Sequence, residues 1–387
     1  MGAINVKHTG SGADVSLSSD GTALLLDGTA IGGGGGTALE LYAENPVTPT
    51  APSATGTNAI AIGDAAVSSG FYSVSLGSFT DSTATNSVAL GASSQALGVK
   101  SLAIHGNATA RESTAIGVNN LGSFATAAGE GAMALGGSYA SGGDSFAAAI
   151  GTNSSSYGAT GANSVAMGEI SKSTGTDSIS IGYANVSSGN KSVALGNNNS
   201  VTAGASFSLG AYNTNSTDFT LTLGQDNVTA HKFSAGIGFG GVTRAWGHHA
   251  TGFGYGINAG TFGLGQSTTD ATAKDLVGGN AATVAGADNQ VILKASSLAG
   301  FTGVISARST TSGSTECAAW EVKGLIRRGT TASDTVLINT AITILSNVPG
   351  WAIALTADTT NGALKISVTG AAATNVKWAA KIETVEV

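Results

Sequence analysis

A short pattern of apolar and small residues returns twelve times between residues 58 and 224. Each copy sets a small residue between two larger apolar ones and closes with a turn residue, as in NSVALG (residues 86–91) and NSVAMG (residues 163–168). Most copies follow one another after 14 residues, as from Gly182 to Gly196. A fixed short period of this kind is typical of a solenoid, in which one structural unit stacks on the next.

The alternation within each copy has period two, which predicts a short β-strand. A glycine ends eleven of the twelve strands, where the coil must turn and where a left-handed backbone carries no Cβ penalty. A second, weaker run follows, as in ANVSSG (residues 184–189). We therefore predict two short strands and two turns per coil. His105 replaces the closing glycine once, and we interpret this as a turn that needs no positive φ rather than as a ligand.

The two larger residues of each copy, such as Val193 and Leu195, are expected to point into the coil. The middle residue is always small, which we interpret as close packing against a second copy of the chain. The predicted interface residues are Ala61, Ser75, Ala89, Ala103, Ala115, Ala134, Ala149, Ala166, Ser180, Ala194, Ser208 and Thr222.

The repeats at residues 86–91 and 163–168 resemble the NSVAIG motif of the YadA-like head repeat of trimeric autotransporter adhesins. The resemblance covers residues 58–226. It implies a left-handed parallel β-roll and a homotrimer. Because the same roll is found in bacterial adhesins and in bacteriophage fibres, the resemblance does not choose between these two functions.

The segments that flank the roll differ in composition. Residues 1–57 combine three short strand patterns with a Gly/Pro-rich linker, and we interpret them as an attachment unit. Residues 227–266 alternate glycine with aromatic residues, which predicts either degenerate coils or a neck. The aromatic residues there are expected to fill a core, with a sugar-binding face as the alternative.

Residues 267–387 predict a separate β-sandwich-like domain. Seven alternating segments read as strands, and the last places Val376, Trp378, Ala380 and Ile382 on one face. Four charged residues, Glu321, Lys323, Arg327 and Arg328, are interpreted as an ordinary solvated surface rather than a charged receptor site.

Candidate chemistry is sparse. Gly236, Gly238 and Gly241 fit a dinucleotide fingerprint but lack a βαβ context, and His248 and His249 are adjacent, so they should face opposite sides of a strand. The chain holds one cysteine, Cys317, and no motif of a hydrolase, kinase or metalloprotease. We expect no catalytic residue, no cofactor and no metal.

The net charge and the hydropathy of the chain argue against two kinds of partner, nucleic acid and the membrane interior. The net charge is −7 without a basic cluster, which disfavours nucleic-acid binding. We also expect no export signal at the start of the chain and no membrane insertion.

The sequence thus favours an all-β, homotrimeric, non-enzymatic fibre of a bacteriophage virion, in the tail or the capsid. Under this hypothesis residues 1–57 contact virion proteins, and the C-terminal domain contacts a host receptor, with a glycan as one candidate. The low charge and the C-terminal strands, which are similar to terminal domains of phage appendages, favour this hypothesis. The alternatives are a trimeric adhesin on a bacterial surface and a fibre that depolymerises polysaccharide.

Overall fold

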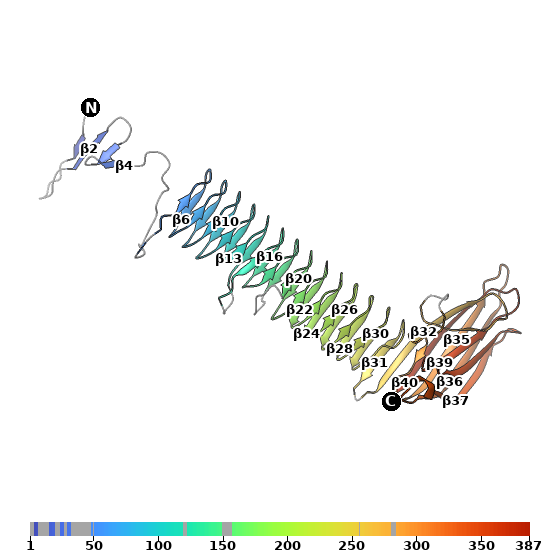
Figure 1. Cartoon of the computed structure of the whole chain (residues 1–387). Coiled ribbons are helices and arrows are strands. Elements are labelled where there is room, and N and C mark those ends of the chain that lie inside the picture. Colours follow the sequence, from blue (N-terminus) through green and yellow to red (C-terminus); the bar gives the residue numbers. More distant parts are fainter. Residues whose placement is uncertain are drawn as a thin grey trace. The chain divides into compact units, whose positions relative to one another are not determined.

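The computed structural model describes residues 4–6, 15–19, 24–26, 29–31, 48, 50–118, 122–148, 157–254, 256–279 and 284–387 (Figure 1). Strands dominate these residues, and the one helical element among them is the short 3-10 turn η1 (Ala332–Asp334). The predicted all-β fold is therefore confirmed. The chain divides into two compact units, Met1–Glu112 and Ser113–Val387, which are described separately below.

The first unit begins with a small antiparallel sheet in the order β1-β2-β3-β4. Its strands are β1 (Ile4–Val6), β2 (Val15–Ser19), β3 (Leu24–Leu26) and β4 (Thr29–Ile31). Residues 20–23, which connect β2 to β3, lie outside the described residues. Most of the linker predicted at the end of residues 1–57 is described, at residues 48 and 50–57, and it contains the first strand of the coils, β5 (Ser53–Ala54).

Parallel coils follow in the same unit. Each coil adds one strand to a long ladder and one shorter strand to a facing short ladder. The long ladder holds β6 (Ile60–Ile62), β8 (Val74–Leu76), β10 (Val88–Leu90) and β12 (Leu102–Ile104). The short ladder holds β5 (Ser53–Ala54), β7 (Val67–Ser68), β9 (Asp81–Ser82), β11 (Gln95–Ala96) and β13 (Gly106–Ala108).

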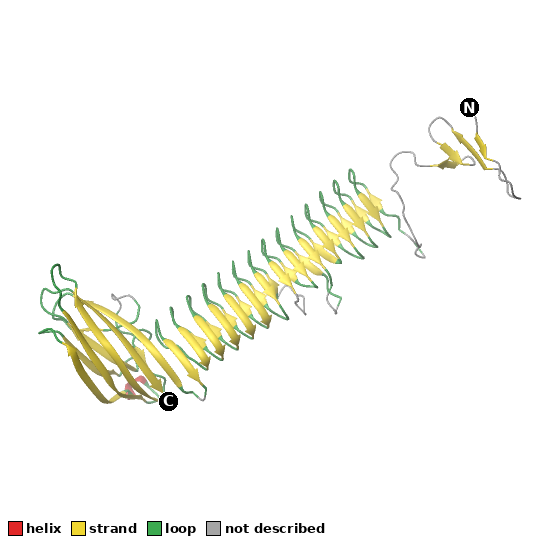
Figure 2. Cartoon of the chain, turned by 180° about the vertical axis from the view of Figure 1, so that it is seen from behind, coloured by secondary structure: helices red, strands yellow, loops and turns green. Residues whose placement is uncertain are grey.

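The second unit starts with coils of the same design, seen as stacked yellow arrows in Figure 2. Its long ladder holds β14 (Thr114–Ile116), β16 (Met133–Leu135), β18 (Phe146–Ala148), β20 (Val165–Met167), β22 (Ile179–Tyr183), β24 (Val193–Asn197), β26 (Phe207–Ala211) and β28 (Leu221–Gln225). Its short ladder holds β15 (Ala125–Ala127), β17 (Tyr139–Ala140), β19 (Gly158–Ala159), β21 (Lys172–Ser173), β23 (Val186–Ser187), β25 (Ser200–Val201), β27 (Thr214–Asn215) and β29 (Val228–Thr229). The segments at 122–131 and 154–162, which lengthen the spacing between successive repeats, contain two of these short-ladder strands, β15 and β19.

The closing glycine is required by both backbone angle and space. Gly210 has φ 128°, and a Cβ there would lie 1.8 Å from the carbonyl oxygen of Gly224 in the next coil. His105 occupies the equivalent turn with φ 47°, so the prediction that this turn avoids positive φ is wrong. The imidazole fits because Gly91 below it has no side chain: a Cβ on Gly91 would lie 2.5 Å from Cε1 of His105.

The segment expected as a possible neck continues the roll. Strands β30 (Ala235–Phe239) and β31 (His249–Phe253) pair in parallel with each other, and β30 pairs with β28, so residues 227–253 form further coils. The predicted core filling by aromatic residues holds for Phe262, which is buried, but Phe239 and Phe253 are 48% and 61% exposed.

An antiparallel domain of two sheets completes the second unit. Strand β32 pairs antiparallel with β31, and the large sheet then runs β32-β40-β35-β36-β37. These strands are β32 (Asn258–Thr268), β35 (Ser297–Ser309), β36 (Cys317–Arg328), β37 (Val336–Ser346) and β40 (Val376–Glu386). In the small sheet β39 pairs with the other three strands: β33 (Lys274–Asp275), β34 (Val291–Ile292), β38 (Ala352–Asp358) and β39 (Ala363–Thr369).

The core of this domain forms from alternate residues of both sheets. Val376, Trp378, Ala380 and Ile382 of β40 are all buried, as their shared face predicted. Trp378 is central to the core: its ring stacks on Trp320 at 5.7 Å, and its Nε1 donates to Thr268 Oγ1 at 3.0 Å. All seven strand segments predicted in this domain form strands, and the sheet begins earlier than predicted, at Asn258.

Candidate functional site

The most extended candidate surface is the outer face of the long ladder, formed by the residues that flank each small middle residue. This face carries two rows, one of residues before and one of residues after the small middle residue. In the second unit the row after the middle residue consists of Ile116, Leu135, Ala148, Met167, Ile181, Leu195, Leu209, Leu223 and Ile237. Ile181 is 37% exposed and Leu209 is 46% exposed, although coils above and below cover their flanks. Exposed apolar rows of this length are typical of surfaces that serve as interaction sites.

The small middle residues occupy the interior of the coil, so the predicted trimer interface is wrong. Ala89 and Ala194 have no exposed surface in the single chain, and Ser75 Oγ donates across the coil to the carbonyl oxygen of Val67 at 2.5 Å. The physical reason is the narrow coil: inward-facing residues of both ladders, such as Ala89 of β10 and Ala96 of β11, together fill its interior. The same burial applies to Ala61, Ala103, Ala115, Ala134, Ala166, Ser180, Ser208 and Thr222.

Ala149 is the one predicted interface residue outside the described residues. The middle position of β18 belongs to Ala147, which pairs with Ala134 on one side and Ala166 on the other. The run FAAAIG (residues 146–151) contains three alanines. Counting back from its glycine therefore placed the middle residue at Ala149, two residues beyond its true position at Ala147.

A ladder of buried asparagines inside the coils was missed by sequence reasoning. Asn185, Asn199, Asn213 and Asn227 recur every 14 residues, and each Nδ2 after the first donates to the Oδ1 of the preceding one at 2.9–3.0 Å. Asn199 Nδ2 also donates to the carbonyl oxygen of Gly210 at 2.8 Å. The spacing alone could have revealed this ladder, which joins successive coils.

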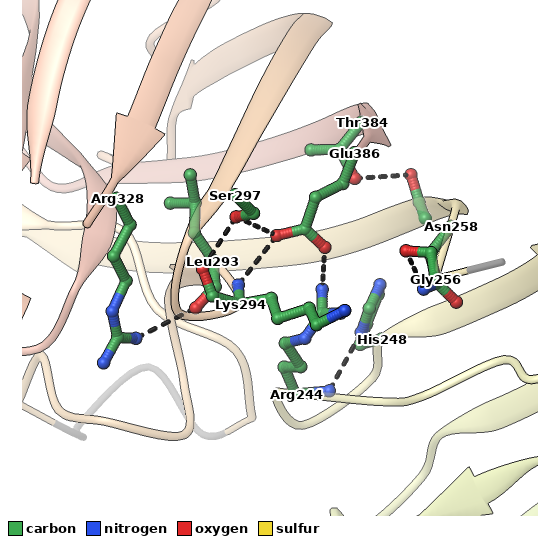
Figure 3. A network of polar contacts seen from close by, with 11 residues as sticks. Arg244, His248, Gly256, Asn258, Leu293, Lys294, Ser297, Arg328, Thr384 and Glu386 are labelled. Atoms are coloured by element: carbon green, nitrogen blue, oxygen red, sulfur yellow. Dashed lines mark hydrogen bonds and ion pairs between the residues drawn. The ribbon is translucent and has the colours of Figure 1, made fainter. Parts of the chain in front are cut away.

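A buried polar network joins the last coil to the C-terminal strand (Figure 3). Arg244 forms an ion pair with Glu386, and the side chains are 13% and 5% exposed. The second carboxylate oxygen of Glu386 accepts from the backbone N–H of Lys294 and from Ser297 Oγ, each at 2.7 Å. These contacts tie together Arg244 of the last coil, the segment between β34 and β35, and β40.

One of the two adjacent histidines is buried and the other is exposed, as expected for side chains that face opposite sides. His248 is 2% exposed and stacks on Phe262 at 4.0 Å, whereas His249 is exposed. Burial, together with the charge of Arg244, lowers the pKa of His248 from 6.5 to about 3, so this imidazole is neutral. Its Nδ1 accepts a hydrogen bond from the backbone N–H of Arg244 at 3.0 Å.

The four charged residues of β36 do not form one patch. Glu321, Lys323 and Arg327 are exposed, as predicted for a solvated surface. Arg328 differs, because it is only partly exposed and its Nη1 donates to the carbonyl oxygen of Leu293 at 2.9 Å. It therefore ties β36 to the segment that follows β34.

A shallow groove of about 790 Å³ lies on the outer face of the large sheet. It passes over Gly300, with the polar side chains of Lys323 and Glu383 in its lining and the apolar side chains of Leu325 and Val385 beside them. The carboxylate of Glu383 pairs with Lys381 at 2.5 Å. This groove offers mixed polar and apolar contacts for a ligand.

The described residues show neither a metal cluster nor a membrane-spanning helix. Those residues contain no group of three or more His, Cys, Asp or Glu side chains that could hold a metal ion. None of the helices among them is long and apolar enough to span a membrane.

The family model of the YadA head domain repeat matches the chain at residues 54–80, 82–104, 159–185, 173–199 and 187–213. These segments lie in the roll, and they confirm that its repeats are YadA-like. No curated protein matches the chain.

One similar solved structure is the tailspike protein gp49 of the Acinetobacter baumannii bacteriophage Fri1, a capsular polysaccharide depolymerase. The two chains are 10% identical, with a TM-score of 0.24 over 84% of the present chain and 62% of the tailspike. The present chain thus spans less than two thirds of that protein, and a likeness this low says nothing about its own function.

Proposed function

We propose that the chain is a homotrimeric fibre of a bacteriophage virion that holds a host-binding C-terminal domain at the end of a YadA-like roll. The observation that carries this proposal is the pair of apolar rows on the outer face of the long ladder. A single chain would leave side chains such as Ile181 and Leu209 in water, and association with further copies would remove them from it. Homo-oligomers with closed symmetry are the usual solution.

The YadA-like repeats support three copies, because the head repeats that they resemble form trimers. The composition supports a fibre as well: only 10% of residues are charged, and 58 are glycine. Bacteriophage fibres share such a composition. Residues 1–57 are assigned to attachment on the virion, either on the tail or on the capsid.

Binding rather than catalysis is the proposed activity. The groove over Gly300 on the large sheet presents Lys323 and Glu383 beside apolar side chains, a combination suited to a surface receptor. An incubation of the full-length protein with host polysaccharide, followed by a reducing-end assay, tests this point. We expect no new reducing ends, and their release would show a depolymerase instead.

Immunogold electron microscopy tests the proposed location. An antibody against the purified chain is applied to bacteriophage particles from a lysed culture and to intact cells of the producing bacterium. We expect label on tail or capsid appendages of the particles. Label on cell envelopes without label on particles would contradict the proposal and support the surface adhesin.

A further inference from the structure

Two phenylalanine rings lie stacked on the surface of the roll, at the corner where each coil enters its long-ladder strand. Phe219 and Phe233 occupy equivalent positions of consecutive coils, with ring centroids 5.3 Å apart and an angle of 10° between ring planes. They are 54% and 58% exposed. The pair therefore presents a flat apolar platform to the surroundings.

The turn itself does not require an aromatic residue. Both phenylalanines adopt the left-handed region, with φ 60° and 57°, which is unfavourable for a bulky side chain. The same corner in earlier coils of this unit holds Asn163 and Asp177, with φ 54° and 57°. Because asparagine is better suited to this backbone, the fold alone gives no reason for two exposed rings here.

Opposite charges stand next to the two rings. Asp218 precedes Phe219, and Lys232 precedes Phe233 at the equivalent position of the next coil. Asp218 Oδ1 accepts from the backbone N–H of Gly204 at 2.8 Å, which fixes the carboxylate at this corner. Lys232 is exposed. The corner thus combines an apolar platform with a hydrogen-bond acceptor and a donor at its rim.

We propose that the corner formed by Asp218, Phe219, Lys232 and Phe233 binds a pyranose ring of a cell-surface polysaccharide. The C–H groups on one face of a pyranose carry partial positive charge and stack on the negative face of an aromatic ring. The hydroxyl groups around the sugar both donate and accept hydrogen bonds, and the carboxylate and the ammonium match them. The site lies on the roll and is separate from the groove of the C-terminal domain.

This inference rests on the proposed function only in that the fibre meets a cell surface. Its test uses full-length protein on a printed array of bacterial surface polysaccharides, with soluble chitohexaose and cellohexaose as competitors. The test variant carries Phe219→Asn and Phe233→Asn, which the left-handed turn accepts. A second variant with Phe219→Tyr and Phe233→Tyr keeps the rings. The matched control is Tyr212→Asn, an aromatic residue 54% exposed with φ 55° on another corner.

We expect the wild type, the tyrosine variant and the Tyr212→Asn control to bind the same polysaccharides. The asparagine variant should lose about tenfold or more in affinity, as the loss of a stacking platform predicts. Unchanged binding by that variant, or no binding by the wild type, would overturn the inference. So would a change in sedimented mass of the asparagine variant, because the rings would then contact a second copy.

The outcome is distinguishable from that of the particle-labelling experiment. Labelled particles without saccharide binding would overturn the site and leave the virion fibre standing. Saccharide binding through these rings without labelled particles would leave the site standing and place the chain elsewhere.

Discussion

Arg244 and Glu386 form a buried ion pair between the last turns of the roll and the last strand of the chain's large sheet (Figure 3). The two residues are 142 positions apart in sequence. Their pairing shows that the roll does not simply end where the C-terminal domain begins, because the two share both a sheet and a polar core.

Replacement of Glu386 by alanine should destabilise this junction strongly. The change leaves the guanidinium of Arg244 buried without its partner, which typically costs about 3–5 kcal/mol. Amide hydrogen exchange of β32 and β40 measures the effect. The control is Glu383→Ala, whose side chain is 51% exposed and pairs with exposed Lys381, and it should cost less than about 1 kcal/mol. Equal exchange in both variants would contradict the role assigned to the pair.

The buried His248 predicts a loss of stability on mild acidification. Its pKa is about 3 in the folded chain and near 6.5 when unfolded, so the unfolded chain takes up a proton first as pH falls. The contribution of neutral His248 to the free energy of unfolding is fully present above pH 6.5. As the pH falls towards 3, this contribution should decrease by roughly 1.4 kcal/mol per pH unit. Thermal unfolding between pH 6.5 and 4.5 measures this slope.

Two variants isolate that contribution. His248→Gln should show a much shallower pH dependence over this range, since the titrating group is gone. His249→Gln, which changes the exposed neighbour, should keep the slope of the wild type. An unchanged slope in His248→Gln would mean that other groups cause the acid sensitivity.

The asparagine ladder predicts a position-specific cost within the coils. Asn199→Ala removes the donor to the carbonyl oxygen of Gly210 and the acceptor of the Asn213 backbone N–H, leaving buried groups unpaired. We expect a loss of about 1–3 kcal/mol per unpaired group. Asn197→Ala, at an exposed position two residues away, should change stability by less than about 0.5 kcal/mol. Denaturant unfolding compares the two, and similar losses would show that the ladder contributes little.

The sequence predicted the roll and the strands of the C-terminal domain well, because both follow from alternation and period. The alternation of β40 around Trp378 gave its buried face correctly. In the coils, the alternation within a three-residue strand does not show which face points inwards, since large apolar residues such as Leu195 suit either a core or an interface. Only the space between the ladders decides this, and that distance is a property of the folded coil.

Positions fixed by tertiary contacts were also beyond sequence reasoning. The turn at His105 takes a positive φ although it lacks glycine, because Gly91 leaves room for the imidazole. The ion pair between Arg244 and Glu386 joins residues with no local signal. The local sequence pattern around Phe219 and Phe233 does not show whether their rings lie in a core or on the surface.

Sedimentation velocity, with circular dichroism of the same samples, tests most directly whether the apolar rows bind further copies. The variants are Leu195→Lys with Leu209→Lys, which face outwards in adjacent coils, and Ala194→Lys alone, which faces inwards. We expect three-chain mass for the wild type, single chains with an intact β spectrum for the double variant, and loss of β structure for Ala194→Lys. A wild type that sediments as one chain, or a double variant that keeps three-chain mass, would contradict the proposal that the apolar rows bind further copies.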